Sequence, residues 1–228
     1  MVGAAVQDYL KVIYKLVNSE QRCMPSLVAE RLGVSNGAVT KMVKRLQELN
    51  LAQYSRNQDI TLTPAGQKIA LETIRHHRLL ELYLMEALGY TWDQVDGEAE
   101  KLEHVISEEF EDRIDAFLGY PTLDPHGDPI PTKEGHLELV RHETLASLRP
   151  GEAAVIQRVT DGDPARLRYL GQLGLYPRTT VEMLEQEPYG GPLRVLVSGA
   201  ERSIGRELAC HIFVSPREAA NLPEEACR

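Results

Sequence analysis

The sequence is poor in cysteine and contains no long hydrophobic run. Its three cysteines, Cys23, Cys210 and Cys227, are widely spaced and include no CxxC pair. This pattern predicts free thiols and gives no signal of a disulfide framework or a thiolate zinc site. No stretch reaches the roughly 18 consecutive apolar residues that a membrane span needs, and the first residues lack the apolar centre of a signal peptide. We therefore expect a cytoplasmic protein with no membrane partner.

Positive charge is also scarce, but it is unevenly distributed. The 228 residues include 25 Lys and Arg against 34 Asp and Glu, which gives a net charge of -9. An acidic chain is a poor partner for nucleic acid, because phosphate contacts need cations. Residues 1–63, however, hold eight basic and five acidic residues. The distribution predicts a basic N-terminal part that binds nucleic acid and an acidic remainder. The carboxylates of the acidic part could bind divalent cations, or they could simply form a solvated surface.

The N-terminal part has the pattern of a winged helix-turn-helix. Apolar residues recur at helical spacing over residues 6–17. Ser26 is the expected cap of a short helix that ends at Gly33, and Ser35 or Asn36 caps the next helix. Two helices joined by a short turn with glycine form a helix-turn-helix. The alternating stretch LAQYSRNQDITLT then predicts a small hairpin, the wing.

The helix after Ser35 has the surface of a DNA-reading element. Its apolar stripe, from Val39 to Leu49, would anchor it to the domain and leaves a face of small polar and basic side chains. Such a face fits the major groove of double-stranded DNA. The alternative is a helical packing unit with a solvated basic face. We predict base or phosphate contacts for Ser35, Asn36, Thr40, Lys41, Lys44, Arg45 and, at the wing tip, Arg56.

Two helical segments and a β-rich region are predicted after the wing. A Thr-Pro pair opens a helix over residues 64–88. A further helix is expected over residues 92–117, before a linker in which prolines exclude helix. From about residue 148 onward, short alternating runs predict a small β-barrel that is interrupted by a helix at 164–173.

Two helical faces carry the ligand types that divalent cations of the manganese and iron class favour. These ions prefer oxygen and imidazole ligands, and a helix presents two ligands to one ion at spacings of three or four residues. Glu100, Glu103 and His104 have this spacing, and so have His77 and Glu81. Each face alone is typical of a solvated helix. Together, after a winged helix-turn-helix, they predict a metal site.

Several segments resemble the diphtheria toxin repressor family of metal-dependent repressors. They are DYLKVIYKL, VSNGAVTKMVKRL, TLTPAGQKIA, HRLLELYL and EAEKLEHVISEE, and RVTDGDPARLRYLGQLGL is similar to that family's C-terminal SH3-like, FeoA-like domain. The resemblance implies a homodimer that binds palindromic operators when Mn(II) or Fe(II) is loaded and that represses metal-uptake genes. It also implies a mainly α fold with small β, in three domains: a winged helix-turn-helix (1–63), a helical dimerisation and metal-binding domain with the Pro-rich linker (64–145), and an SH3-like β-barrel (146–228).

The resemblance also implies two sets of metal ligands. Iron-sensing members have Met and Cys at the positions of Asp8 and Glu100, so the carboxylates here imply a response to Mn(II), with Fe(II) as the alternative. Compact manganese regulators have a further Glu where this chain has Lys11, which argues against their two-ion cluster. The principal set is Asp8, His77, Glu100, Glu103 and His104. The second set is Glu81, Asp124, His126 and Asp163, with Asp161 as a rival of Asp163 and a plain turn at 124–126 as the alternative.

A route from metal to DNA follows from these positions. Asp8 lies on the helix before the DNA-binding motif, whereas Glu103 lies on the helix that we expect to dimerise through Leu102, Val105 and Ile106. An ion bound by both would fix the spacing of two recognition helices. The alternatives are a metalloenzyme that uses the Glu and His cluster, a winged-helix protein that responds to another signal, and a structural module. The sequence has no nucleophile motif or phosphate loop, so we expect neither catalysis nor a small organic substrate.

Overall fold

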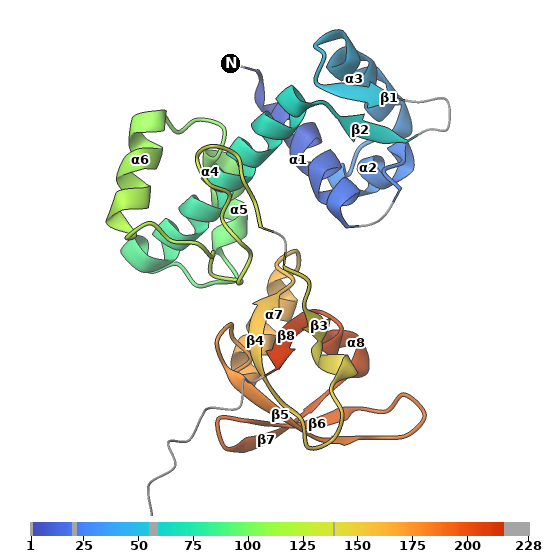
Figure 1. Cartoon of the computed structure of the whole chain (residues 1–228), viewed down its shortest axis with the longest axis vertical. Coiled ribbons are helices and arrows are strands. Elements are labelled where there is room, and N and C mark those ends of the chain that lie inside the picture. The colour runs from blue at the N-terminus through green and yellow to red at the C-terminus, as the bar shows by residue number, and fades with distance from the viewer. Residues whose placement is uncertain (1, 20–21, 55–58, 139, 217–228) are drawn as a thin grey trace, which may run out of the picture. The chain divides into compact units, whose positions relative to one another are not determined.

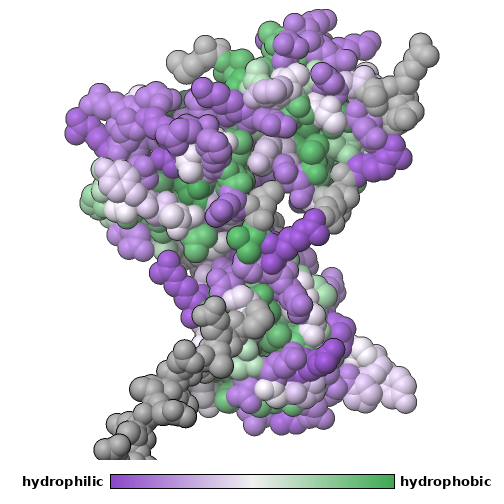
Figure 2. Space-filling model, viewed as in Figure 1, coloured by the Kyte–Doolittle hydropathy of each residue, from purple (hydrophilic) through white to green (hydrophobic). Residues whose placement is uncertain are grey.

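The computed structural model describes most of the chain, namely residues 2–19, 22–54, 59–138 and 140–216. Within these ranges, no helix combines the length and the apolar character needed to cross a membrane. The face seen in Figure 2 is mainly hydrophilic, with smaller apolar areas between the polar side chains.

The chain forms two compact units, and each contains more than one segment of the sequence. The first unit holds the helices that carry most of the predicted metal ligands and DNA-contacting residues, and the second holds the large β-sheet. The first comprises Met1–Tyr90, Gly97–Thr122 and Pro129–Glu138, and the second comprises Thr91–Asp96, Leu123–Asp128 and Leu139–Arg228.

The first unit begins with the predicted winged helix-turn-helix (Figure 1). Helices α1 (Ala4–Asn18), α2 (Pro25–Leu32) and α3 (Asn36–Glu48) pack around one apolar core. Strands β1 (Ala52–Tyr54) and β2 (Ile60–Leu62) pair antiparallel as the wing. The periodic apolar residues are buried because each helix can cover only one stripe against the others.

The ends of these helices agree with the predictions in part. Ser35 is the N-cap of α3, and its side chain accepts a hydrogen bond from the backbone N–H of Ala38 at 3.2 Å. The prediction that Ser26 caps α2 is wrong, because the helix already begins at Pro25, whose missing N–H costs nothing in a first turn. Val17 and Leu49, at the ends of two predicted stripes, are exposed.

Helix α4 (Pro64–Leu88) has the predicted bounds and connects the wing to the rest of the unit. The side chain of Thr63 caps it by accepting a hydrogen bond from the N–H of Gly66. A Cβ atom on Gly66 would lie 2.0 Å from the carbonyl oxygen of Leu51, so only glycine permits this close approach of helix and wing. Helix α1 packs against α4, which joins the winged part to the helical part.

The single helix expected over residues 92–117 is wrong, because the structure has two helices there. These are α5 (Val95–Leu102) and α6 (Glu108–Phe117). Ser107 is the N-cap of α6, where its side chain accepts a hydrogen bond from the N–H of Phe110 at 3.2 Å. Glutamates in the first turn of α6 favour its start at this point, since carboxylates stabilise helix N-termini. The break leaves residues 103–107 outside both helices, with a turn at 103–105.

The second unit contains a six-stranded antiparallel sheet in the order β3-β8-β4-β5-β6-β7. Helix α7 (Pro164–Leu173) has the predicted bounds, and a short helix α8 (Arg206–Ala209) precedes the last strand. Alternate residues of the strands, such as Ile156 and Val195, are fully buried. The strands are β3 (Glu143–Thr144), β4 (Ala153–Val159), β5 (Thr180–Gln186), β6 (Leu193–Val197), β7 (Ala200–Ile204) and β8 (Ile212–Pro216).

Candidate metal centre

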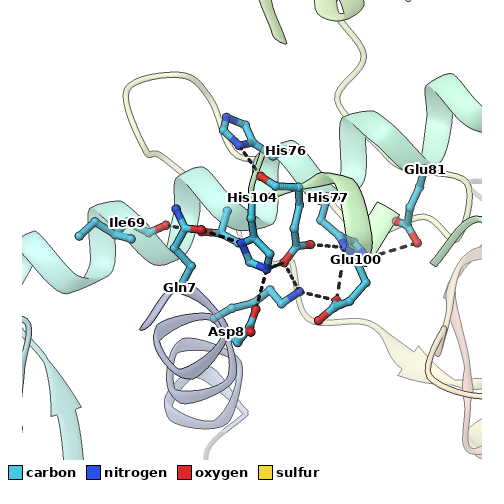
Figure 3. A network of polar contacts seen from close by, with 11 residues as sticks. Gln7, Asp8, Ile69, His76, His77, Glu81, Glu100 and His104 are labelled. Carbon is cyan, nitrogen blue, oxygen red and sulfur yellow. Dashed lines mark hydrogen bonds and ion pairs between the residues drawn. The ribbon is translucent and has the colours of Figure 1, made fainter. Parts of the chain in front are cut away.

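The five side chains predicted as the principal metal ligands converge within the first unit (Figure 3). Helix α1 contributes one, α4 contributes another, and the last turn of α5 with the turn after it contributes the rest. The backbone N–H of Glu103 still donates to the carbonyl of Ala99 at 2.9 Å, so the helical spacing of Glu100 and Glu103 is kept although α5 ends at Leu102. The five are Asp8, His77, Glu100, Glu103 and His104.

His104 lies between two carboxylates from different elements. Its Nε2 is 2.8 Å from Oδ1 of Asp8 and 3.4 Å from Oε1 of Glu103. Its Nδ1 lies 2.6 Å from Oε1 of Gln7, a contact that orients the ring so that Nε2 faces the two carboxylates. Among the described residues, the buried Oδ1 of Asp8 receives no aligned hydrogen bond. Three electron-pair donors that face one another fit a divalent cation.

His77 contacts a member of each predicted ligand set. Its Nδ1 lies 2.5 Å from Oε2 of Glu103 and 3.8 Å from Oε2 of Glu100. Its Nε2 lies 3.5 Å from Oε1 of Glu81, one turn further along α4. The side chains of Glu81 and Glu103 have no exposed area, whereas that of Glu100 is 51% exposed. His77 therefore lies inside the unit, and Glu100 lies where the cluster meets solvent.

Lys11, which the sequence analysis noted at the position of a possible further ligand, adds a positive charge to the cluster. Its Nζ lies 2.6 Å from Oε2 of Glu100 and 2.5 Å from Oε1 of Glu103, and its side chain is only 7% exposed. A buried lysine is rare unless it is paired. Its spacing in the sequence could have indicated this position, because a residue three positions after Asp8 lies on the same side of α1.

The charges of the cluster shift the pKa values of its members in different directions. Burial alone would raise the pKa of Glu103, but His77 and Lys11 outweigh burial, and the pKa is lowered. Burial also dominates at Asp8, where His104 and Lys11 compensate only in part, so this pKa is raised. Burial is therefore less completely compensated at Asp8 than at Glu103, and a nearby cation would stabilise the charged form of Asp8.

A second layer of contacts holds the turn that carries Glu103 and His104. Nδ1 of His76 lies 3.0 Å from the backbone carbonyl oxygen of Glu103, and its Nε2 lies 3.2 Å from Oε2 of Glu111. Nε of Arg75 donates to the other oxygen of Glu111 at 2.5 Å and its Nη2 donates to Asp115 at 2.7 Å. The sequence analysis missed this network, because a histidine beside His77 has no spacing signal of its own.

The predicted second ligand set is divided between the two units. Glu81 lies on α4 in the first unit. Asp124 and His126 lie in the second unit, where Oδ1 of Asp124 accepts hydrogen bonds from the backbone N–H groups of His126 and Asp128 at 2.8 and 2.9 Å. Nε2 of His126 lies 2.7 Å from the carbonyl oxygen of Trp92. Asp124 thus forms the turn that was the alternative reading of this segment.

Asp163 and Asp161 also lie in the second unit. Asp163 is the N-cap of α7, and its side chain accepts hydrogen bonds from the N–H groups of Ala165 and Arg166 at 2.9 and 3.3 Å. Helix capping is therefore a structural role of this side chain.

The predicted DNA-contacting residues of α3 form one exposed face. All of them are exposed, whereas Val39, Val43 and Leu46 of the same helix are buried. Thr40 also donates a hydrogen bond to the carbonyl of Asn36 at 2.9 Å. Arg56 lies outside the described residues. The exposed residues are Ser35, Asn36, Thr40, Lys41, Lys44 and Arg45.

Models of known protein families match almost the whole chain. Residues 1–59 match the N-terminal DNA binding domain of iron dependent repressors, residues 63–132 their metal binding and dimerisation domain, and residues 143–216 the FeoA domain. The iron-dependent repressor IdeR of Mycobacterium leprae (strain TN) is 30% identical over 214 residues, which are 88% of this chain and 92% of that protein. The chain belongs to the iron-dependent repressor family.

Other members of the family are similar over most of their length. IdeR of Mycobacterium tuberculosis (strain ATCC 25618 / H37Rv) is 31% identical over 206 residues, 85% of this chain and 88% of that protein. A manganese-dependent transcriptional repressor solved in complex with manganese has a TM-score of 0.86 and 36% identity, covering 93% of this chain and 100% of that chain. The manganese regulator SloR has a TM-score of 0.75 and 33% identity, with coverages of 93% and 98%.

Family membership confirms several predictions from the sequence. The fold class is the predicted one, with a DNA-binding domain, a helical metal-binding and dimerisation domain and a FeoA, SH3-like domain. The family consists of metal-dependent transcriptional repressors that bind DNA, and not of enzymes. The chain is therefore a metal-dependent, DNA-binding repressor with a dimerisation domain.

Proposed function

We propose that this family member is a manganese-responsive repressor that acts as a homodimer on palindromic operators. One observation carries the proposal: the contact of Asp8 on α1 with His104, at 2.8 Å, connects the winged part to the metal-binding part. Helix α1 belongs to the apolar core of the winged part through Val6, Leu10 and Ile13. Anything that changes the contacts of Asp8 therefore acts on the DNA-binding domain.

The ligands that we propose for the regulatory ion are Asp8, Glu103 and His104, together with Glu100 and His77. Carboxylate oxygens and imidazole nitrogens suit Mn(II) in type and hardness. When bound, the ion supplies positive charge to buried carboxylates. Asp8 and Glu103 then hold α1 against the end of α5, and Gln7 keeps the ring of His104 in the orientation that directs Nε2 at them.

The choice of Mn(II) over Fe(II) is supported by the donor set. Asp8 and Glu100 supply carboxylates at the two positions where iron-sensing members have the softer Met and Cys ligands. Hard oxygen donors favour Mn(II) relative to thiolate and thioether donors. Affinity alone does not decide selectivity, so the alternative of an Fe(II)-responsive repressor is tested in the same experiment.

For a second ion we propose the ligand set Glu81, Asp124, His126 and Asp163, with Asp161 as the rival of Asp163. The support is the position of these residues relative to the family pattern and the burial of Glu81 beside His77. The test is the number of Mn(II) ions bound per chain, measured by calorimetry. Glu81→Gln should lower this number by about one and leave the affinity of the remaining site unchanged, and an unchanged number would overturn the second set.

The proposed action on DNA uses the exposed face of α3. Ser35, Asn36, Thr40 and Lys41 contact bases or phosphates, Lys44 and Arg45 contact phosphates, and Arg56 extends this set at the wing tip. In a dimer that is held by the α5–α6 region, two such faces would lie about 34 Å apart, one turn of DNA. Because the target is DNA, we propose that the protein acts in the cytoplasm, represses metal-uptake genes and has no organic substrate.

The deciding experiment is a DNA-binding titration on the upstream region of the protein's own gene. Mn(II), anaerobic Fe(II), Zn(II) and metal-free buffer are compared in parallel. We expect Mn(II) to tighten binding about 5- to 150-fold, the usual range of allosteric coupling. Equal binding without metal would overturn the proposal in favour of a winged-helix protein with another signal. A greater response to Fe(II) would identify an iron-responsive member.

A further inference from the structure

Lys11 holds the same oxygen atoms that the proposed ligand set offers to an ion. Its Nζ lies 2.5 Å from Oε1 of Glu103, and this oxygen is also the one that faces Nε2 of His104 at 3.4 Å. The ammonium group lies 2.6 Å from Oε2 of Glu100, the oxygen nearest to Nδ1 of His77 at 3.8 Å. An ammonium at hydrogen-bond distance and a metal ion cannot both occupy this side of Oε1 of Glu103.

The environment makes these contacts strong. The side chain of Lys11 is 7% exposed and that of Glu103 is not exposed at all. Two buried opposite charges that have lost their water depend on each other, because removal of one leaves the other uncompensated. Without Lys11, Glu103 would face the carboxylates of Asp8 and Glu100 with only the two histidines nearby.

The charge balance of the cluster points in the same direction. Asp8, Glu100 and Glu103 carry three negative charges when ionised, and Lys11 carries one positive charge. One divalent cation together with the ammonium would neutralise the three carboxylates, whereas a second divalent cation would leave an excess of positive charge. Lys11 therefore supplies positive charge to the carboxylates of the metal-free cluster.

Resting on the proposed function, we propose that Lys11 is a built-in competitor for the regulatory metal ion. Its ammonium group holds Glu103 and Glu100 until a divalent cation takes Oε1 of Glu103, and the cost of displacing it sets the metal concentration at which the repressor is loaded. Lys11 lies on α1 next to Leu10, which is fully buried in the winged core. Displacement of the ammonium by a metal ion therefore also changes the contacts that hold α1, and with it the winged part, against the metal cluster. Lys11 is a residue that sets affinity and positions α1, and it is not itself a metal ligand.

The test is the affinity for Mn(II) of the full chain without DNA, measured by calorimetry and by the electron paramagnetic resonance signal of free Mn(II). Lys11→Met keeps the apolar stem and removes the charge, and we expect it to bind Mn(II) at least about tenfold more tightly than the parent, since the competitor is gone. Lys11→Arg should keep an affinity near that of the parent. Lys15→Met, one turn further along α1 at an exposed position, is the matched control and should change nothing.

A merely structural role for Lys11 would have a different signature. Lys11→Met would then bind Mn(II) with unchanged or weaker affinity, and this outcome overturns the proposal. Lys11→Gln, which retains hydrogen-bonding groups, is measured alongside it in case the methionine variant does not fold without metal. Failure of the proposed function is distinguishable, because Glu103→Ala would then bind Mn(II) as the parent does.

Discussion

Asp8 and His104 come from distant parts of the first unit's sequence and lie in contact, with 2.8 Å between Oδ1 and Nε2. Asp8 is carried by a helix of the winged core, and His104 follows the last turn of α5. Together with the contacts of Gln7 and Lys11, the pair links the DNA-binding part to the metal-binding part. A ligand that binds both residues has a direct effect on the position of α1.

Removal of either side of this link should uncouple metal from DNA. We expect Asp8→Ala and Glu103→Ala to lose the Mn(II)-stimulated part of operator binding, a decrease of about 5- to 150-fold at saturating metal. The measurement is a gel-shift titration with and without Mn(II). Glu109→Ala, at a position 76% exposed on α6, is the control and should respond as the parent does. Unchanged stimulation in both variants of the link would contradict the mechanism.

The basic face of α3 should affect DNA binding alone. Lys41→Ala removes one cation from an exposed position, so we expect weaker operator binding and a salt dependence whose slope falls by about one. Mn(II) affinity should stay the same, because Lys41 makes no contact with the metal cluster. Lys101→Ala, exposed on α5 and paired with Glu98, is the matched control. Weaker Mn(II) binding by Lys41→Ala in calorimetry would count against its role in DNA contact.

The buried network around Glu111 should contribute to stability in a pH-dependent way. Burial would raise the pKa of Glu111, but hydrogen bonds and charges from His76 and Arg75 outweigh it, and the pKa is lowered from its ordinary value of 4.5. The contacts therefore stabilise the fold above pH 4.5, and this contribution is lost as the pH falls through the lowered pKa.

We expect Glu111→Gln to lower the free energy of unfolding at pH 7 by about 2 to 3 kcal/mol, less than for a fully uncompensated buried charge because Asp115 still contacts Arg75. The difference between variant and parent should shrink as the pH falls below 4.5. Urea unfolding at pH 7 and at pH 4 provides the measurement. Glu109→Gln should show no change, and a difference that is independent of pH would argue against the ionised network.

The cysteines should differ in reactivity. Cys23 and Cys210 are free thiols, as the sequence predicted, and Cys227 lies outside the described residues. Burial, with a smaller contribution from Asp59, raises the pKa of the Cys23 thiol to about 11, whereas Cys210 is exposed. Since the thiolate is the reactive form, alkylation at pH 8 should modify Cys210 and leave Cys23 unmodified until the chain unfolds. Peptide mapping would identify the modified residue. Equal rates at the two residues would contradict the burial of Cys23.

The elements that the sequence predicted correctly have local signals. Ser35 caps α3 and Thr63 caps α4 through hydrogen bonds to residues only three positions away. The break after α5 also had a local signal, the cap at Ser107, but the helical periodicity on both sides concealed it. A capping residue is a signal of a single position, whereas helical periodicity extends over many residues. The periodicity therefore dominated the prediction at this point.

The sequence by itself determined the winged motif, the ligand types and their spacing, since these depend on neighbours along one helix. Only the tertiary structure decided that Lys11 lies between Glu100 and Glu103 and that Gln7 orients the ring of His104. Those contacts join residues about ninety positions apart. The distances of these contacts depend on how α1 packs beside α4 and α5, and no short stretch of sequence specifies that packing. The apolar faces determine which sides of the helices meet, but they do not determine which polar atoms at the edge of the contact touch.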